Sequence, residues 1–308
     1  MMSRSLFYCS DLSRKVAEVT FGTASIGDVW LLIEYPFAWE PRAVEESALA
    51  PHVKAFINRT LKTVPRSRVL FIKRDRSPES GITCFITSTR ESAPFIFKAQ
   101  LSSYEELTRL DIASLAAGNL SAQAEAVTDP LFLICTHGRR DKCCAKFGYP
   151  LYKSLRAATN ENMWQSSHVG GDRFAANLIC LPHGLFYAHV TADAGQKIMS
   201  EYRAGRLVLD KYRGRACYSH PAQAAEFFIR SETGLTGIDA LRYASSQHVE
   251  RNHWRVRFTY QPDEKIYEAD VSVRMSEFQS LITCHATEEK AVPQFVLNGL
   301  REIALSKS

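Results

Sequence analysis

Short apolar runs separated by polar turns dominate the first 120 residues of this chain. Because strands in a packed sheet are typically four to eight apolar residues long, these runs predict strands at 28–35, 68–74, 81–90 and 93–100, the last two as a hairpin. Helical spacing of apolar residues predicts helices at 44–62 and 103–117. The second helix has Ser103 as its expected cap, with Glu106 three positions on. The element order is therefore β-α-β-β-β-α.

A similar pattern follows. The predicted strands cover 130–135, 163–167, 176–182 and 184–190, and the predicted helices cover 143–158 and 192–205. Pro150 begins or breaks the first of these helices, and Pro182-His183-Gly184 is a strong turn signal between the last two strands. Both stretches have the element order of a thioredoxin-like fold. The fold class expected is α/β, with two thioredoxin-like units in tandem, the first of them without a site.

The remainder predicts an α+β extension. A helix at 219–232 begins at Ser219, and the alternating segments 253–261 and 265–275 predict an exposed hairpin. Residues 278–286 add a possible strand, and the C-terminal segment is expected to be partly helical. The predicted divisions are 1–122 (scaffold half), 123–213 (half that carries the site) and 214–308 (helix-and-hairpin extension).

Composition changes this picture little. Hydrophobic residues make up 45% and charged residues 23%, as in ordinary globular proteins, and a net charge of +5 without basic runs gives no indication of nucleic-acid binding. No apolar run approaches the roughly 20 residues that span a bilayer, and the N-terminus lacks a signal-peptide pattern, so the cytoplasm is the expected compartment. Eight cysteines without a regular framework favour a metal site or a reactive thiol over a disulfide scaffold.

The candidate chemistry lies between residues 131 and 173. Cys135 ends an apolar strand, and Cys144 begins a helix after eight intervening residues. A helix N-terminus and the basic loop residues Arg139 and Arg140 favour thiolates there. His168 and Asp172 flank a Gly-Gly turn that can aim both side chains at one point. Two thiolates, an imidazole and a carboxylate suit a tetrahedral zinc ion or a [2Fe–2S] cluster.

The segments CTHGRRDKCC and SSHVGGDRFAANLICLPHGLFYAHV resemble the sucrase/ferredoxin-like family, as do FYCSDLS, FGTA and LLIEYPFAW. The resemblance implies a thioredoxin-like ferredoxin whose [2Fe–2S] cluster is held by two Cys and the two His of an HxGGH motif. Carried over, Cys135, Cys144 and His168 match three ligands, and Asp172 stands in place of the second His. Three interpretations follow: Asp172 ligates, which we favour; His183, His189 or a water takes the fourth place; or the site is degraded.

The sequence thus favours an electron carrier that meets an unidentified redox protein, with a possible docking rim of Arg139, Arg140 and Arg173. The alternatives are a zinc-binding or metal-free scaffold and a thiol redox protein, although no CxxC motif is present. No hydrolase constellation stands out. Cys143, Cys9 and Cys284 are expected to be packed thiols, and Asp141 is expected to cap the helix that follows it.

Overall fold

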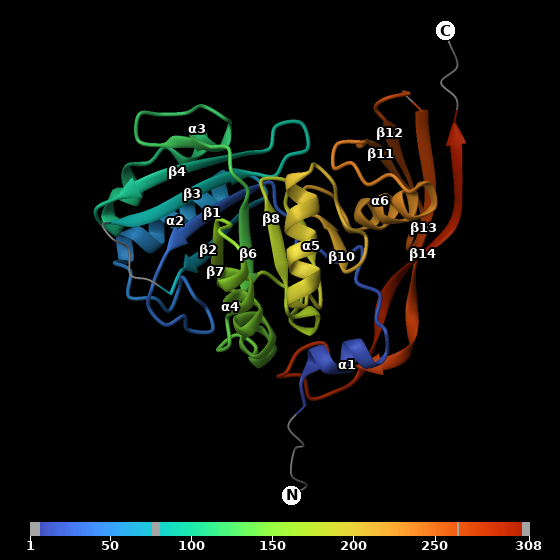
Figure 1. Ribbon diagram of the computed structural model, residues 1–308, viewed down its shortest axis with the longest axis horizontal. Coiled ribbons are helices and arrows are strands. Elements are labelled where there is room, and N and C mark those ends of the chain that lie inside the picture. The colour runs from blue at the N-terminus through green and yellow to red at the C-terminus, as the bar shows by residue number, and fades with distance from the viewer. Residues whose placement is uncertain (1–6, 76–80, 264, 304–308) are drawn as a thin grey trace, which may run out of the picture.

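The computed structural model describes residues 7–75, 81–263 and 265–303. Expectations for the first six residues, for position 264 in the turn of the C-terminal hairpin and for residues 304–308 lie outside this range. The described residues form a mixed α/β structure with one large mixed sheet and a second, four-stranded sheet (Figure 1). None of the helices in the described ranges combines the length and the apolar character needed to cross a membrane.

Ten strands of the described chain form the large sheet, in the order β10-β9-β8-β6-β7-β2-β1-β3-β4-β5. Their bounds are β1 (Val29–Glu34), β2 (Ser67–Lys73), β3 (Ile82–Ser88), β4 (Phe95–Leu101), β5 (Glu125–Val127), β6 (Leu131–Cys135), β7 (Met163–Ser166), β8 (Leu178–Leu181), β9 (Leu185–Tyr187) and β10 (Tyr212–Arg215). The pairs β1–β2 and β6–β7 are parallel, and every other neighbour is antiparallel. The short β2–β7 pairing, Ile72 with Ser166 and Lys73 with Gln165, joins the two halves into one sheet.

Alternation along the strands divides the apolar residues between the two faces of this sheet. Val29, Leu31 and Ile33 of β1 belong to a core that includes residues of α2 (Pro51–Thr63), η1 (Tyr104–Arg109) and α3 (Ile112–Ala116). In the second half, α4 (Tyr149–Ala158) and α5 (Ala192–Arg203) close a corresponding core. The intervening residues, such as Trp30 of β1 and Leu133 of β6, form one core on the other face that continues through both halves. Side chains at alternate positions point to opposite faces, which explains the division.

The second sheet is an antiparallel meander of β11 (Leu241–Glu250), β12 (His253–Tyr260), β13 (Lys265–Ser280) and β14 (Lys290–Ile303). Helix α6 (His220–Thr233) packs on it through a shared apolar cluster and also contacts β10 of the large sheet. The long β13–β14 hairpin reaches past the large sheet, and its far end lies beside α1 (Cys9–Lys15) at the bottom of Figure 1.

Several local predictions are confirmed. The hairpin at Pro182 is present as β8 and β9, α5 follows it, and Pro150 lies in the first turn of α4. A π-helical turn, η2 (Cys144–Gly148), precedes α4. Asp141 accepts a hydrogen bond from the backbone N–H of Cys143 at 2.9 Å, as expected of a cap.

Other predictions were wrong. The expected helix at 103–117 is a 3₁₀ helix, η1, followed by the short α3. Ser103 makes no capping hydrogen bond, and Glu106 instead accepts one from the backbone N–H of Ser102 at 2.8 Å. The predicted strand at 278–286 ends at Ser280 as the tail of β13.

The largest error concerns the C-terminal segment, which forms strand β14 and not a partial helix. Its sequence has good helix formers, but it pairs with β13 along its whole length. The pairing runs from Ile266 opposite Ile303 at one end to Ser280 opposite Lys290 at the other. Tertiary pairing overrides a weak local propensity here. Strand β11 was missed because most of its residues are exposed and carry no apolar alternation.

Candidate metal centre

The predicted site lies where the parallel strands β6 and β7 end. Cys135 is the last residue of β6, His168 follows β7 by two residues, and Cys144 opens η2. Open α/β sheets commonly bind ligands at the carboxyl ends of parallel strands, because the connecting loops gather there. Gly148 permits the close approach of η2 to β6, since a Cβ at this position would stand only 2.0 Å from the carbonyl oxygen of Cys135.

Three of the four predicted ligands come together. The ligand atoms of Cys135, Cys144 and His168 all lie within 4.8 Å of one another. The Cys144 Sγ lies 4.0 Å from His168 Nδ1. Both cysteines are buried, whereas the His168 side chain is 21% exposed, so the imidazole is the part of the group nearest to solvent.

Asp172 lies on the opposite side of the imidazole from the thiols. Its Oδ1 is 3.2 Å from His168 Nε2, while Nδ1 of the same ring faces Cys144. This oxygen is buried and makes no aligned hydrogen bond in the described part of the chain. A buried carboxylate oxygen without a hydrogen-bond partner is costly, and such groups commonly accept a proton or bind a cation. Asp172 therefore contacts the group of three through His168 and is not itself one of the three.

The Gly-Gly turn between His168 and Asp172 is fixed by a buried arginine. Gly171 has a φ of +81°, which only glycine adopts readily. Arg213 is 1% exposed and donates to the carbonyl oxygen of Gly170 at 3.1 Å and to Asn177 Oδ1 at 2.8 Å. Asn177 in turn donates to the carbonyl oxygen of Gly171 at 3.0 Å. Arg213 and Asn177 therefore determine where the turn places His168 and Asp172.

His137 fixes the backbone on the other side of His168. It is 2% exposed, its Nδ1 accepts from the backbone N–H of His168 at 3.2 Å, and its Nε2 lies 2.9 Å from the carbonyl oxygen of Glu40. A carbonyl oxygen only accepts, so the proton of His137 is on Nε2. Burial lowers the pKa of His137 and keeps this tautomer neutral. His137 thus acts as a hydrogen-bonding residue that joins its loop to the backbone of Glu40 and His168.

The electrostatics of the group favour one thiolate. Hydrogen bonding from Cys144, reinforced by His168, lowers the pKa of Cys135 well below its ordinary value although burial acts against it. The pKa of Cys144 is correspondingly raised, by its hydrogen bond to Cys135 and by burial. Burial lowers the pKa of His168, but the hydrogen bond and charge of Cys135 and the charge of Asp172 outweigh it, so the net shift is upward. Burial raises the pKa of Asp172 to about 6, although His168 opposes this.

The three candidate rim arginines have different surroundings. Arg139 and Arg140 are exposed; Arg139 pairs with Glu40, and the charge of Arg140 acts on His168. Arg173 is 18% exposed and is bound to the buried Glu18 at 2.6 Å. Arg139 and Arg140 are thus both accessible, and Arg140 is the one whose charge reaches His168.

His183 and His189, considered for a fourth ligand, contact other groups. His183 Nδ1 lies 2.6 Å from the hydroxyl of Tyr202, and His189 lies between Ser10 and Ser13 of α1. Burial lowers the pKa of His183 to about 4 and that of His189 to about 3, so both imidazoles are neutral at physiological pH.

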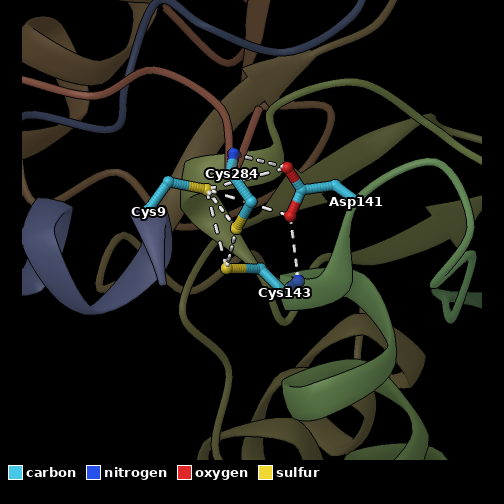
Figure 2. Close-up of side chains that lie close together, drawn as sticks. All are labelled: Cys9, Asp141, Cys143 and Cys284. Carbon is cyan, nitrogen blue, oxygen red and sulfur yellow. Dashed lines mark hydrogen bonds between the residues drawn. The ribbon is translucent and has the colours of Figure 1, made fainter. Parts of the chain in front are cut away.

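A second group of possible ligands escaped the sequence analysis. Cys9, Asp141, Cys143 and Cys284 bring their ligand atoms within 4.8 Å of one another (Figure 2). From the sequence, all three cysteines are expected to be packed thiols. They come from α1, from the position just before η2 and from the loop after β13, and at least 134 positions separate any two of them. No local spacing could have revealed this group.

Comparison with known proteins agrees with the resemblance seen in the motifs. The model of the family described as sucrase/ferredoxin-like matches residues 20–214, well over half of the chain. The chain belongs to the sucrase/ferredoxin-like family. The match includes all residues of the candidate centre and ends before α6 and the four-stranded sheet.

One curated relative of this sucrase/ferredoxin-like chain is "Altered inheritance of mitochondria protein 32" from Meyerozyma guilliermondii, which is 30% identical over 135 residues. The alignment covers 40% of this chain and 46% of that protein, so it spans less than half of the relative. No solved structure matches the chain.

Proposed function

We propose that this protein is a [2Fe–2S] electron carrier whose two halves are thioredoxin-like units. The observation that carries the proposal is the convergence of Cys135, Cys144 and His168 at the end of β6 and β7. The order of strands supports the fold: each half, read outward from the β2–β7 junction, has a parallel pair followed by three antiparallel strands. The first half lacks a comparable ligand set among its described residues.

The donor set fits the group that the family name suggests. Thiolates and imidazoles are the ligands of [2Fe–2S] clusters that mix Cys and His. A bound cluster of this kind would take up and release one electron. The chain supplies a stabilised thiolate at Cys135, two buried sulfurs and a partly exposed imidazole. We place the docking site of a redox protein partner over His168, beside Arg139 and Arg140.

The geometry favours an orienting role for Asp172. Its oxygen can accept the Nε2 proton of His168 and orient a ring that binds through Nδ1, whereas direct ligation of iron by Asp172 would require the carboxylate to leave its place on the far side of the imidazole from the thiols. Its carboxylate makes the surroundings of the cluster one charge more negative than an imidazole at position 172 would. A more negative site stabilises the oxidised state, so replacement of Asp172 should raise the potential.

Iron and acid-labile sulfide analysis of protein purified without oxygen tests the proposal. We expect stoichiometric iron and sulfide in the wild type, loss of both in Cys135→Ser, and no change in Cys84→Ser, which alters an equally buried cysteine remote from the site. Protein-film voltammetry of Asp172→His should show a higher potential than the wild type. Colourless wild-type protein with zinc or no metal at this centre would support the scaffold alternative and refute the electron carrier.

A further inference from the structure

The cluster of Cys9, Asp141, Cys143 and Cys284 lies outside the proposed electron-transfer centre. Its three sulfurs form a nearly regular triangle, with Sγ–Sγ distances of 3.5 Å (Cys9–Cys143), 3.2 Å (Cys143–Cys284) and 3.5 Å (Cys284–Cys9). A disulfide requires about 2.05 Å, so the described structure contains three separate thiols. A disulfide would also use only two of the three sulfurs.

The triangle has the size of one face of a zinc tetrahedron. With Zn–S bonds of about 2.3 Å and tetrahedral angles, the sulfurs would stand about 3.8 Å apart. Each sulfur must therefore move outward by only a few tenths of an ångström to admit the ion. An iron–sulfur cluster distributes its thiolates over several irons, so three sulfurs in mutual contact fit a single ion better.

Asp141 organises this triangle. Its Oδ1 accepts from the backbone N–H of Cys143 at 2.9 Å, and its Oδ2 accepts from the backbone N–H of Cys284 at 2.8 Å (Figure 2). Both oxygens lie about equally far from Cys9 Sγ, at 3.9 and 4.0 Å. The carboxylate thus fixes two ligand backbones and offers an oxygen as the fourth donor, an arrangement typical of groups that support or complete a metal site.

The surroundings offset the negative charge that such a site accumulates. The backbone N–H of Ser10 donates to Cys143 Sγ at 3.4 Å, and the guanidinium of Arg14 is close enough for its charge to act on the same sulfur. Thiolate is the form in which cysteine binds metal.

Apolar packing around this cluster is sparse. Among the described residues, its hydrophobic neighbours are the buried Ala175 and the partly buried Tyr8 and Phe147. The cluster nevertheless joins α1, the loop before η2 and the tip of the β13–β14 hairpin (Figure 1). A small contact that ties distant segments without a substantial apolar core is where a structural metal ion adds most stability.

We propose that Cys9, Cys143, Cys284 and Asp141 bind one zinc ion, which fastens the N-terminal helix and the β13–β14 hairpin to the loop of the electron-transfer centre. The ion would be structural, because all four positions of the tetrahedron are filled by the chain. Asp141 and Cys143 lie one to three positions from Cys144, so the ion also restrains the loop that presents Cys144. The zinc site does not depend on the identity of the cofactor at Cys135.

Elemental analysis of full-length protein purified without chelators and without oxygen tests the zinc site. We expect about one zinc per chain in the wild type and its loss in Cys284→Ser, with iron unchanged. Cys217→Ser is the matched control, because Cys217 is also a partly buried thiol but lies in the α6 core. Cys135→Ser should lose iron and keep zinc, which excludes binding of the zinc at the other centre.

Thiol alkylation of the wild type gives a second test that needs no variant. With zinc bound, Cys284 should resist iodoacetamide, and chelation should make it reactive, while Cys217 should react equally in both states. The proposal is overturned if wild-type protein contains no zinc, if Cys284→Ser retains it, or if mass spectrometry of anoxic protein finds two of the three cysteines in a disulfide.

Discussion

The Gly171→Ala substitution should destabilise the protein well beyond the ordinary effect of alanine at a positive φ. A Cβ at Gly171 would stand 2.6 Å from Arg213 Nη2 and 2.9 Å from Cζ and Nη1. A flexible arginine tip would normally move away. Arg213 is buried and held by Thr23, Gly170 and Asn177, so it can move only by breaking hydrogen bonds.

The magnitude follows from those bonds. Alanine at a φ of +81° costs about 1–2 kcal/mol by itself. Displacing Arg213 Nη1 breaks its bonds to Gly170 and Asn177, and hydrogen bonds to a charged group contribute about 1.5–3 kcal/mol each, of which part is recovered by relaxation. We therefore expect Gly171→Ala to lower the free energy of unfolding by about 2–4 kcal/mol in addition to the cost of the positive φ. At about 2–4 °C per kcal/mol, the excess shift in Tm is roughly 4–16 °C.

Gly205→Ala is the matched control. Gly205 has a φ of +73°, and no heavy atom lies within 4 Å of a Cβ built there, so this variant carries only the backbone effect. Differential scanning calorimetry of both variants in the metal-depleted state measures the difference without a contribution from metal binding. Equal Tm values for Gly171→Ala and Gly205→Ala would refute the reasoning that Arg213 is immobile and fixes the turn.

Two further predictions concern buried titratable groups. Because the folded pKa of His189 is lowered to about 3, its effect on stability is absent above the unfolded pKa of about 6.5 and grows as pH falls toward 3, since only the unfolded state takes up the proton. Between pH 7 and pH 5, the free energy of unfolding of His189→Gln should therefore fall by about 2 kcal/mol less than that of the wild type. Urea titrations at both pH values measure this difference, and the same pH dependence in both proteins would contradict the prediction. Glu226 pairs with Arg230 at 3.1 Å with both side chains fully buried, so Glu226→Ala should cost about 3–5 kcal/mol. Glu201→Gln, at an exposed pair, should leave the urea midpoint unchanged, and equal midpoints for both variants would oppose the prediction.

Local patterns in the sequence were sufficient to predict most strands of the large sheet. The runs around β1, β6 and the β8–β9 hairpin are short, apolar and bounded by turn residues, so the strand is the only element that buries them. The same locality made Cys135, Cys144 and His168 predictable, because each follows a recognisable strand or begins a helix and all occur within 34 consecutive residues.

Tertiary structure decided the rest. Strand β14 exists because β13 supplies a partner along its length, which no local propensity encodes. The position of Asp172 behind His168 depends on Arg213, which is 41 residues away in the sequence and reaches the turn from β10. The sulfur triangle joins residues 9, 143 and 284, and only the folding of the β13–β14 hairpin back onto α1 brings them together. Short-range hydrophobic patterning determines which elements form. Contacts between distant segments depend instead on how those elements pack, and no single local segment of the sequence determines that packing.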